Sequence, residues 1–198
     1  MSKLYFRFGA MGCSKTAQAL ITKFNYEERG MKVLLMKPST DNRDGATILK
    51  SRIGLTAEAV TVAPEVNVFD LYSKKYSDCN VVIVDECQFL TPTQVDELAQ
   101  IVIDYDIPVL CFGLSTDFLT NLFPGSKRLF EIAQSISEIK SVCTCGSKAT
   151  VNARFDDNGN IVYSGAQVVL GGNDRYMAMC RKCWLQRKKE QEARGIFS

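Results

Sequence analysis

A run of apolar, mostly β-branched residues constrains the fold of this chain more than any other feature. Residues 80–85 read NVVIVD, with no polar residue among the valines and the isoleucine. Such a run presents no polar face to water, so it predicts a central strand covered on both faces of a sheet. Further strands are expected at residues 3–8, 31–37 and 108–113, the last of them also buried.

Helical segments are expected between these strands. One covers about residues 15–29 and is stopped by Gly30. Another begins at Thr91 as N-cap, and Gln94 completes a capping box. A third is expected over residues 127–135. Strands that alternate with helices predict an α/β fold with a mostly parallel, doubly wound central sheet.

Composition and charge exclude several classes of protein. With 198 residues and 46% apolar content, the chain can bury one sizeable core. A net charge of +2 gives no electrostatic reason to bind nucleic acid or a membrane surface. No stretch approaches the roughly 18 apolar residues of a membrane span. We therefore expect a soluble, cytoplasmic protein with reduced thiols. The chain has no histidine, so base catalysis would fall to a carboxylate.

The character of the sequence changes near its last third, which predicts a first domain over residues 1–140 and a second over 141–198. In the second domain, residues 151–155 and 161–163 flank the turn signal DNGN and predict a β-hairpin. A charged helix is expected over about residues 182–194.

A segment of small residues connects the first strand to the first helix. Residues 9–16 read GAMGCSKT. In a phosphate-binding loop, backbone N–H groups hold a polyphosphate, a lysine reaches its outer phosphates and a hydroxyl ligates magnesium. Lys15 and Thr16 fit the last two roles. Ser14 stands where such loops carry glycine, so we expect weaker nucleotide affinity. The alternative is a plain turn before an amphipathic helix.

Two carboxylates follow the buried strand at residues 80–85. Ligands of α/β proteins bind at the carboxyl ends of such strands. Asp85 can hold the magnesium of a nucleotide through water, and Glu86 can take a proton from an acceptor hydroxyl. The alternative is an acidic cap on the next helix.

Charged residues also follow the second strand. Asp41 and Arg43 should lie at the same edge of the sheet, where Arg43 could stabilise charge on a transferring phosphoryl group. Solvation of an ordinary polar loop is the alternative explanation.

Eight cysteines fall into two groups. Four are scattered through the first 120 residues, as expected for packing. The other four form two close pairs, Cys143/Cys145 and Cys180/Cys183, and four thiolates make a closed tetrahedral zinc site. The second domain is therefore predicted to hold structural zinc. Free thiols in a core are the alternative.

Aromatic residues follow two of the strands. Phe89, Phe118 and Phe123 could stack on a planar base. Ordinary core packing is the alternative for each of them.

Taken together, these landmarks resemble the type II thymidine kinase family over most of the chain. The resemblance rests on the four paired cysteines and on residues 9–16, 41–43, 85–89, 113–125 and 171–176. It implies a phosphate-loop nucleoside kinase domain with a small zinc-binding domain. The implied reaction transfers the γ-phosphoryl of ATP to the 5′-hydroxyl of thymidine, with magnesium as cofactor.

The resemblance also implies residue roles, with Glu86 as general base. Nucleotide contacts are expected from Gly9, Ala10, Met11, Gly12, Cys13, Ser14, Lys15, Thr16, Asp41, Arg43, Asp85, Glu86, Cys87 and Gln88. The base is expected between Met11, Phe89, Leu114, Phe118, Phe123 and Tyr176, with a lasso-like loop that includes Val169 and Gly171 and has Asn152 at its approach. A homotetramer is implied, with deoxyuridine as a second acceptor and dTTP as a candidate feedback inhibitor.

Two other functions remain open from the sequence. An ATP hydrolase would use Glu86 to activate water. A zinc-ribbon nucleic-acid-binding module would use the basic run at residues 187–189, although the second domain lacks a continuous basic stripe.

Overall fold

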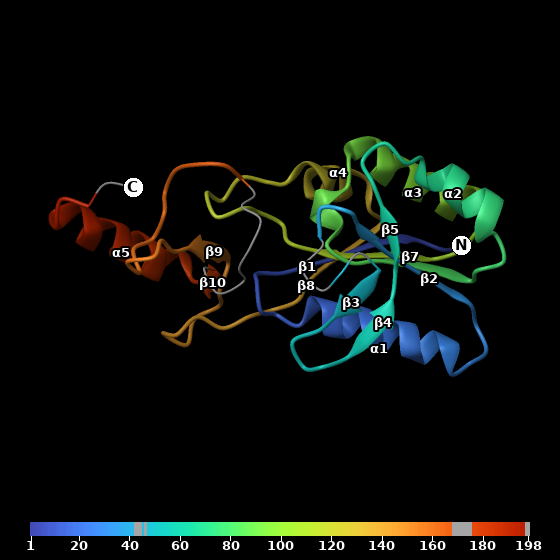
Figure 1. Cartoon of the computed structure of the whole chain (residues 1–198), viewed down its shortest axis with the longest axis horizontal. Coiled ribbons are helices and arrows are strands. Elements are labelled where there is room, and N and C mark those ends of the chain that lie inside the picture. The colour runs from blue at the N-terminus through green and yellow to red at the C-terminus, as the bar shows by residue number, and fades with distance from the viewer. Residues whose placement is uncertain (42–44, 46, 168–175, 197–198) are drawn as a thin grey trace.

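A parallel sheet forms the centre of the molecule. The computed structural model describes residues 1–41, 45, 47–167 and 176–196. Six strands pair in the order β5-β2-β6-β7-β1-β8, all of them parallel (Figure 1). Their bounds are β1 Leu4–Phe8, β2 Val33–Pro38, β5 Val60–Val62, β6 Val81–Val84, β7 Val109–Gly113 and β8 Ser135–Glu138. The predicted α/β class with a mostly parallel sheet is confirmed.

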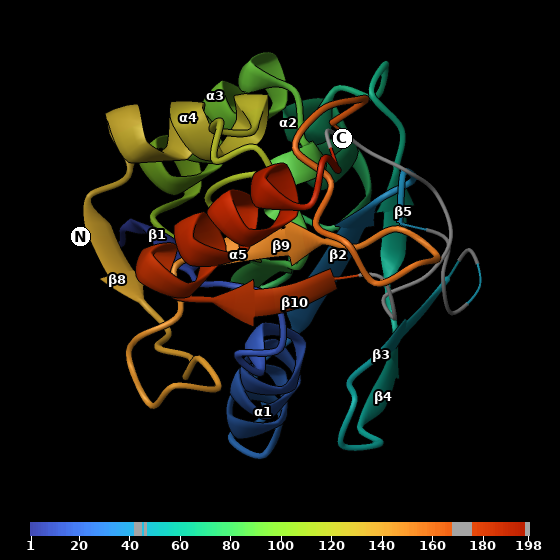
Figure 2. The same cartoon turned by 90° about the vertical axis from the view of Figure 1, so that its left-hand side faces the viewer.

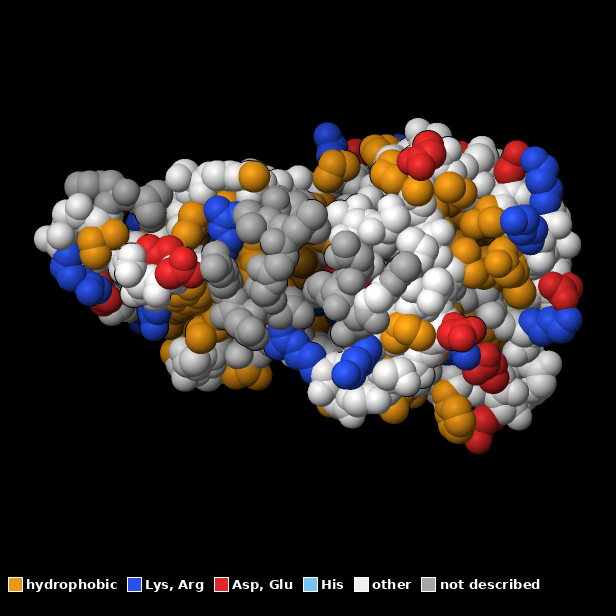
Figure 3. Space-filling model, viewed as in Figure 1, with side chains coloured by type: hydrophobic (Ala, Val, Ile, Leu, Met, Phe, Trp, Pro, Cys, Tyr) orange, Lys and Arg blue, Asp and Glu red, His pale blue; other side chains and the backbone are white. Residues whose placement is uncertain are grey.

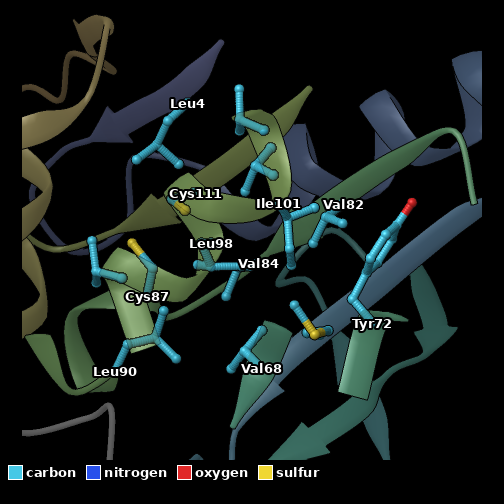
Figure 4. Close-up of a cluster of buried hydrophobic side chains, with 14 of the residues drawn as sticks. Leu4, Val68, Tyr72, Val82, Val84, Cys87, Leu90, Leu98, Ile101 and Cys111 are labelled. Carbon is cyan, nitrogen blue, oxygen red and sulfur yellow. The ribbon is translucent and has the colours of Figure 1, made fainter. Parts of the chain in front are cut away.

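Helices cover both faces of this sheet. Helix α1 (Lys15–Glu27) lies on one face, and α2 (Val68–Lys75), α3 (Pro92–Tyr105) and α4 (Pro124–Ile132) lie on the other (Figures 1 and 2). The larger core lies beneath α2–α4 and includes Leu4, Tyr72, Val82, Val84, Cys87, Leu98 and Cys111 (Figure 4). Strand β6 is buried along its whole length, as its apolar sequence predicts.

A short hairpin shares the α1 face of the sheet. Strands β3 (Ile48–Lys50) and β4 (Thr56–Glu58) are antiparallel. The smaller core joins Leu49 of this hairpin to Ala19 and Leu20 of α1. The hairpin therefore packs on α1, the helix that begins within residues 9–16.

Helix α3 shows how local sequence sets an element. The Thr91 side chain accepts a hydrogen bond from the Gln94 N–H, and the Gln94 side chain accepts one from the Thr91 N–H. Pro92 occupies the first turn, where its missing N–H costs nothing. The predicted capping box is confirmed.

The C-terminal part forms a small module at one end of the molecule (Figure 1). Strands β9 (Val151–Arg154) and β10 (Tyr176–Met179) are antiparallel, and α5 (Arg181–Ala193) follows them. The module has its own core, in which Trp184 meets Tyr163 edge to face at 5.1 Å between ring centroids. A domain boundary near residue 140 stays a prediction.

Two predicted elements differ in the structure. Residues 151–154 pair with β10, a partner that the sequence did not predict. The predicted hairpin forms only at its turn end, where Phe155 and Ile161 form an antiparallel bridge and the Val162 N–H donates to the Arg154 carbonyl at 2.8 Å. The tight turn at Asp156 and Gly159 does form. Helix α4 begins at Pro124, which suits the first helical position, and residue 135 already belongs to β8.

The surface carries charges of both signs. Figure 3 shows Lys and Arg side chains interspersed with Asp and Glu side chains on the face it presents. Within the described ranges, no helix is both long and apolar enough to cross a membrane.

Candidate active site

Residues 9–16, the predicted phosphate-binding loop (the phosphate loop below), lead from β1 into α1. The Lys15 side chain donates back to the backbone of this loop. A Cβ atom on Gly9 would lie 2.4 Å from the Ile139 carbonyl oxygen and 2.5 Å from Cys13 Sγ, so only glycine fits there. Lys15 is buried, and its Nζ donates to the carbonyl oxygens of Ala10 at 2.9 Å and Gly9 at 3.3 Å. If a polyphosphate bound in the loop, the Lys15 ammonium group could donate to its oxygens in place of these carbonyls.

Left-handed backbone occurs twice in this loop. Gly12 has φ +73°, which glycine adopts without strain. Ser14 has φ 63° and ψ 27° directly before α1, and its side chain makes no capping bond. A side chain with a Cβ atom is strained there. The sequence-based expectation that Ser14 weakens nucleotide affinity stays a prediction.

Asp85 directly follows β6, and its carboxylate is deeply buried. The residue is 1% exposed, and no described group forms a hydrogen bond of good geometry to either carboxylate oxygen, although the Thr16 hydroxyl and the Glu86 backbone lie close enough to affect its pKa. Burial, together with the charge of Glu86, raises the pKa of Asp85 to about 7, although the Thr16 hydroxyl and Lys15 oppose this shift. An unpartnered buried carboxylate beside a threonine hydroxyl and a lysine is a donor set that fits a hydrated Mg²⁺ ion.

Glu86 is held at the start of a single 3-10 turn, η1 (Cys87–Phe89). Its backbone is left-handed, with φ 51°. Gln88 Nε2 donates to Glu86 Oε2, while Gln88 Oε1 accepts from the Leu114 N–H at 2.9 Å. Gln88 is 1% exposed. It therefore fixes the Glu86 carboxylate relative to the end of β7.

Tight packing supports this turn. A Cβ atom on Gly113 would lie 2.5 Å from Gln88 Oε1 and 2.7 Å from Cys87 Sγ. A Cβ atom on Gly125 would lie 2.6 Å from the Cys87 carbonyl oxygen. The two glycines let β7 and α4 approach the turn that carries Glu86.

The three aromatic residues surround the loop after β7. Phe89 and Phe123 meet edge to face at 5.6 Å between ring centroids, and Phe123 is buried. Phe118 is 1% exposed. Asp117 Oδ1 shapes the loop by accepting from the N–H groups of Leu119 and Asn121. The Leu114 side chain is half-buried at the start of this loop.

Strand β9 of the C-terminal module docks on the site through Asn152. Asn152 Oδ1 accepts from the Met11 N–H of the phosphate loop at 2.8 Å, and its Nδ2 donates to the Thr116 carbonyl at 2.9 Å. Asn152 is 3% exposed. The side chain thus connects the phosphate loop to the loop after β7.

Arg154 extends the same contact. Its guanidinium lies 3.7 Å from the centroid of the Phe118 ring and donates to the carbonyls of Ser164 and Ala166. Gln167 Nε2 donates to Asp117 Oδ2 at 3.0 Å, beside the same loop. Arg154 therefore covers one face of Phe118 and leaves less of that ring for a ligand.

The four paired cysteines converge in the module. Their sulfur atoms all lie within 4.8 Å of one another, and those of Cys145 and Cys180 are 3.6 Å apart. Tetrahedral zinc with bonds of about 2.3 Å sets its sulfurs roughly 3.8 Å apart. Hydrogen bonds from the Ser147 hydroxyl and backbone lower the pKa of Cys145 to about 6, whereas the sulfurs of Cys145 and Cys180 raise the pKa of Cys183 to about 12. The donor set fits structural zinc.

The remaining predicted residues fall in four places. Arg43, Val169 and Gly171 lie outside the described residues. Asp41 is 5% exposed in the turn after β2. Tyr176 opposes Arg154 across the β9–β10 pair and is half-buried. Cys87 points into the larger core near Cys111, so its side chain does not face the site (Figure 4).

Two residues that the structure brings to this site were not predicted from the sequence. Arg154 belongs to β9, whose pairing with β10 was not predicted. Arg52 lies in the β3–β4 turn, with Nη1 3.7 Å from the position of a Cβ atom on Gly12. Neither residue lies in a recognisable motif, so only the tertiary structure places them.

Comparison with known proteins agrees with this arrangement. The thymidine kinase family model matches residues 2–184. A thymidine kinase of Zymomonas mobilis is 44% identical over 94% of this chain and 98% of the relative. The thymidine kinase of Enterobacteria phage T4 is 42% identical over 96% of this chain and 99% of the relative. Among solved structures, a DNA replication initiation factor aligns with 70% of this chain and 40% of its own at a TM-score of 0.43 and 14% identity, too remote to bear on function. The chain belongs to the thymidine kinase family.

Proposed function

We propose that this chain transfers the γ-phosphoryl group of ATP to the 5′-hydroxyl of thymidine. The observation that carries the proposal is the pair at the end of β6. The buried Asp85 carboxylate has no partner among the described residues, and the next residue, Glu86, is held by Gln88. The Asp85 carboxylate is suited to hold a cation, and the Glu86 carboxylate is suited to accept a proton.

The donor nucleotide lies along the phosphate loop. Backbone N–H groups of residues 9–16 and the N-terminus of α1 bind its phosphates. Lys15 exchanges its bonds to the loop carbonyls for the β- and γ-phosphates. Arg43, outside the described residues, is proposed to assist. The Asn152 contact to Met11 holds the loop in shape during this exchange.

Asp85 and Thr16 would hold magnesium, directly or through water. Asp85 follows the carboxyl end of β6, and Thr16 lies at the N-terminal end of α1. When bound, magnesium neutralises phosphate charge and orients the γ-phosphoryl group. Lys15 supplies further positive charge at the phosphates.

Glu86 acts as the general base. As the thymidine 5′-oxygen bonds to the γ-phosphorus, the hydroxyl proton passes to the Glu86 carboxylate and the bond to the β-phosphate oxygen breaks, releasing ADP. The proton acceptor must be correctly placed within hydrogen-bond reach of that hydroxyl. The bond from Gln88 keeps one carboxylate oxygen fixed for this purpose.

The thymine base is proposed to lie among the aromatic residues that border the loop after β7. Phe89 is half-buried and retains ring surface for stacking. Met11, Leu114, Phe118, Phe123 and Tyr176 complete the proposed pocket, with Val169 and Gly171 reading the edge of the base. Asn152 supports this pocket by donating a hydrogen bond from Nδ2 to the Thr116 carbonyl in the loop after β7.

Other parts of the proposal concern the whole protein. Structural zinc at the four paired cysteines would stabilise the C-terminal module. A cytoplasmic homotetramer, acceptance of deoxyuridine and inhibition by dTTP follow from the family and are proposed for this chain with it.

Transfer of labelled phosphate tests the function. The full-length protein is incubated with magnesium and γ-labelled ATP, together with thymidine, with 5′-deoxythymidine or with no nucleoside. The label should reach thymidine alone, because 5′-deoxythymidine has no 5′-hydroxyl to accept it. Equal ADP release in all three reactions would identify an ATP hydrolase and refute the proposal.

A further inference from the structure

The turn between β3 and β4 has a rigid backbone. The Ser51 N–H donates to the Leu55 carbonyl at 2.8 Å, and the Leu55 N–H donates to Ser51 Oγ at 2.9 Å. The Gly54 N–H donates to the Ser51 carbonyl at 3.0 Å, and Gly54 has φ +90°. Ser51 is only 4% exposed. These bonds fix the turn in one conformation.

The hairpin is also anchored to the main sheet. Lys37 of β2 is fully buried, and its Nζ donates to the carbonyls of Gly45 and Ile48 at 2.8 Å each. Leu49 packs in the core that contains Leu20 of α1. Because α1 begins at the phosphate loop, the hairpin turn is held at a set position relative to that loop.

Arg52 lies in this rigid turn with an exposed side chain. Its Nη1 lies 3.7 Å from where a Cβ atom on Gly12 would be, so the guanidinium stands directly over the phosphate loop. Within the described part of the chain, this guanidinium has no ion-pair or hydrogen-bond partner.

A fixed backbone that presents a guanidinium over the phosphate loop is suited to an anionic ligand. MgATP keeps net negative charge after magnesium has bound, and Lys15 supplies one cation for it. A planar guanidinium can bind two phosphate oxygens at once, which an ammonium group does less well. We propose that Arg52 binds the phosphate chain of the ATP donor as a second cation. This inference rests on the use of ATP by the chain.

Three variants test the inference, and each is compared with the wild type. Arg52→Gln removes the charge, Arg52→Lys keeps the charge without the fork, and Arg29→Gln is the matched control. Arg29 is exposed just beyond the far end of α1, roughly 20 Å along the helix from the phosphate loop. Each protein is assayed for kcat and KM with both substrates and for its melting temperature.

Arg52→Gln should lower kcat/KM for ATP about 10–100-fold, the loss expected for a charged hydrogen-bonded contact. Arg52→Lys should recover part of this loss. The KM for thymidine and the melting temperature should stay near the wild-type values. The inference is overturned if Arg52→Gln and Arg29→Gln have the same kcat/KM for ATP.

A binding measurement separates this inference from the proposed function. Titration of thymidine-free protein with magnesium and a non-hydrolysable ATP analogue needs no phosphoryl transfer. The analogue should bind Arg52→Gln more weakly than Arg29→Gln, even if the wild type phosphorylates no thymidine. Equal dissociation constants for these two variants would contradict the role of Arg52.

Discussion

The Met11 N–H donates to Asn152 Oδ1 at 2.8 Å, so strand β9 of the C-terminal module holds the backbone of the phosphate loop. The same side chain donates to the Thr116 carbonyl. The module is thus connected to the nucleotide side of the site and to the loop proposed to surround the thymine base. Asn152 acts here as a positioning residue, through two backbone groups.

Asn152→Ala should therefore impair the use of ATP. Loss of the bond frees the Met11 N–H inside a buried contact, at a cost of about 1–3 kcal/mol. We expect kcat/KM for ATP to fall about tenfold, and the melting temperature to fall by several degrees. Asn158→Ala, in the exposed turn after β9, is the control. Unchanged ATP kinetics in Asn152→Ala would show that the contact does not position the loop.

Asp85→Asn should stabilise the protein in the absence of magnesium and nucleotide. The folded-state pKa of about 7 lies above the ordinary value of 3.8, so the folded protein binds this proton more tightly than the unfolded chain. Stability is therefore lost as the pH rises between these values, and the full cost of the buried charge is present above about pH 7.

The gain in melting temperature from Asp85→Asn should thus be larger at pH 8 than at pH 5. Thermal unfolding in magnesium-free buffer without chelator measures it, since a chelator could remove zinc. Glu65→Gln, an exposed carboxylate, is the control. An equal gain at the two pH values would mean that burial of Asp85 does not control its ionisation.

Ser14→Gly should also stabilise the fold. The left-handed backbone at Ser14 costs roughly 1 kcal/mol that glycine does not incur. For a chain of this length, that corresponds to about 2–4 °C in melting temperature. Ser14→Ala keeps the Cβ atom and should show no gain. If alanine stabilises as much as glycine, relief of backbone strain is not the cause.

Local sequence patterns predicted some elements of this fold and not others. The capping box at Thr91 and the apolar run of β6 depend on neighbouring residues, so the sequence was sufficient to predict them. The pairing of β9 with β10 joins residues more than twenty positions apart. The nearer segment at residues 161–163 pairs with the end of β9 around Phe155 and Ile161, as the turn signal predicts, but no local pattern indicated that the rest of β9 has a distant partner.

Some residues of the candidate site could likewise be predicted from the sequence, and others could not. Asp85 and Glu86, which follow β6, and Lys15, in the loop-to-helix segment after β1, were predictable because parallel strands bring their carboxyl ends to one edge. Asn152 was expected near the base, yet its contact to Met11 depends on how the module docks. Arg52 lies in the β3–β4 hairpin, which no local sequence pattern indicated.

Removal of one paired cysteine tests the zinc site. Cys183→Ser should purify with less zinc and unfold at a lower temperature, because the four sulfurs form one cluster. Cys79→Ser, outside that cluster, should keep its zinc. Metal content by mass spectrometry and thermal unfolding provide the readouts. Wild-type protein that purifies without zinc, and gains no stability when zinc is added, would rule out this role for the cysteines.

The Glu86→Gln variant gives the most direct test of the account, because it replaces the proposed base with a side chain of nearly the same shape. Thymidine-dependent ADP release should fall about 10²–10⁴-fold, since glutamine cannot accept the hydroxyl proton. Binding of the non-hydrolysable ATP analogue should stay within about twofold of the wild type, because the phosphate loop is unchanged. A Glu86→Gln protein that phosphorylates thymidine at the wild-type rate would contradict the account.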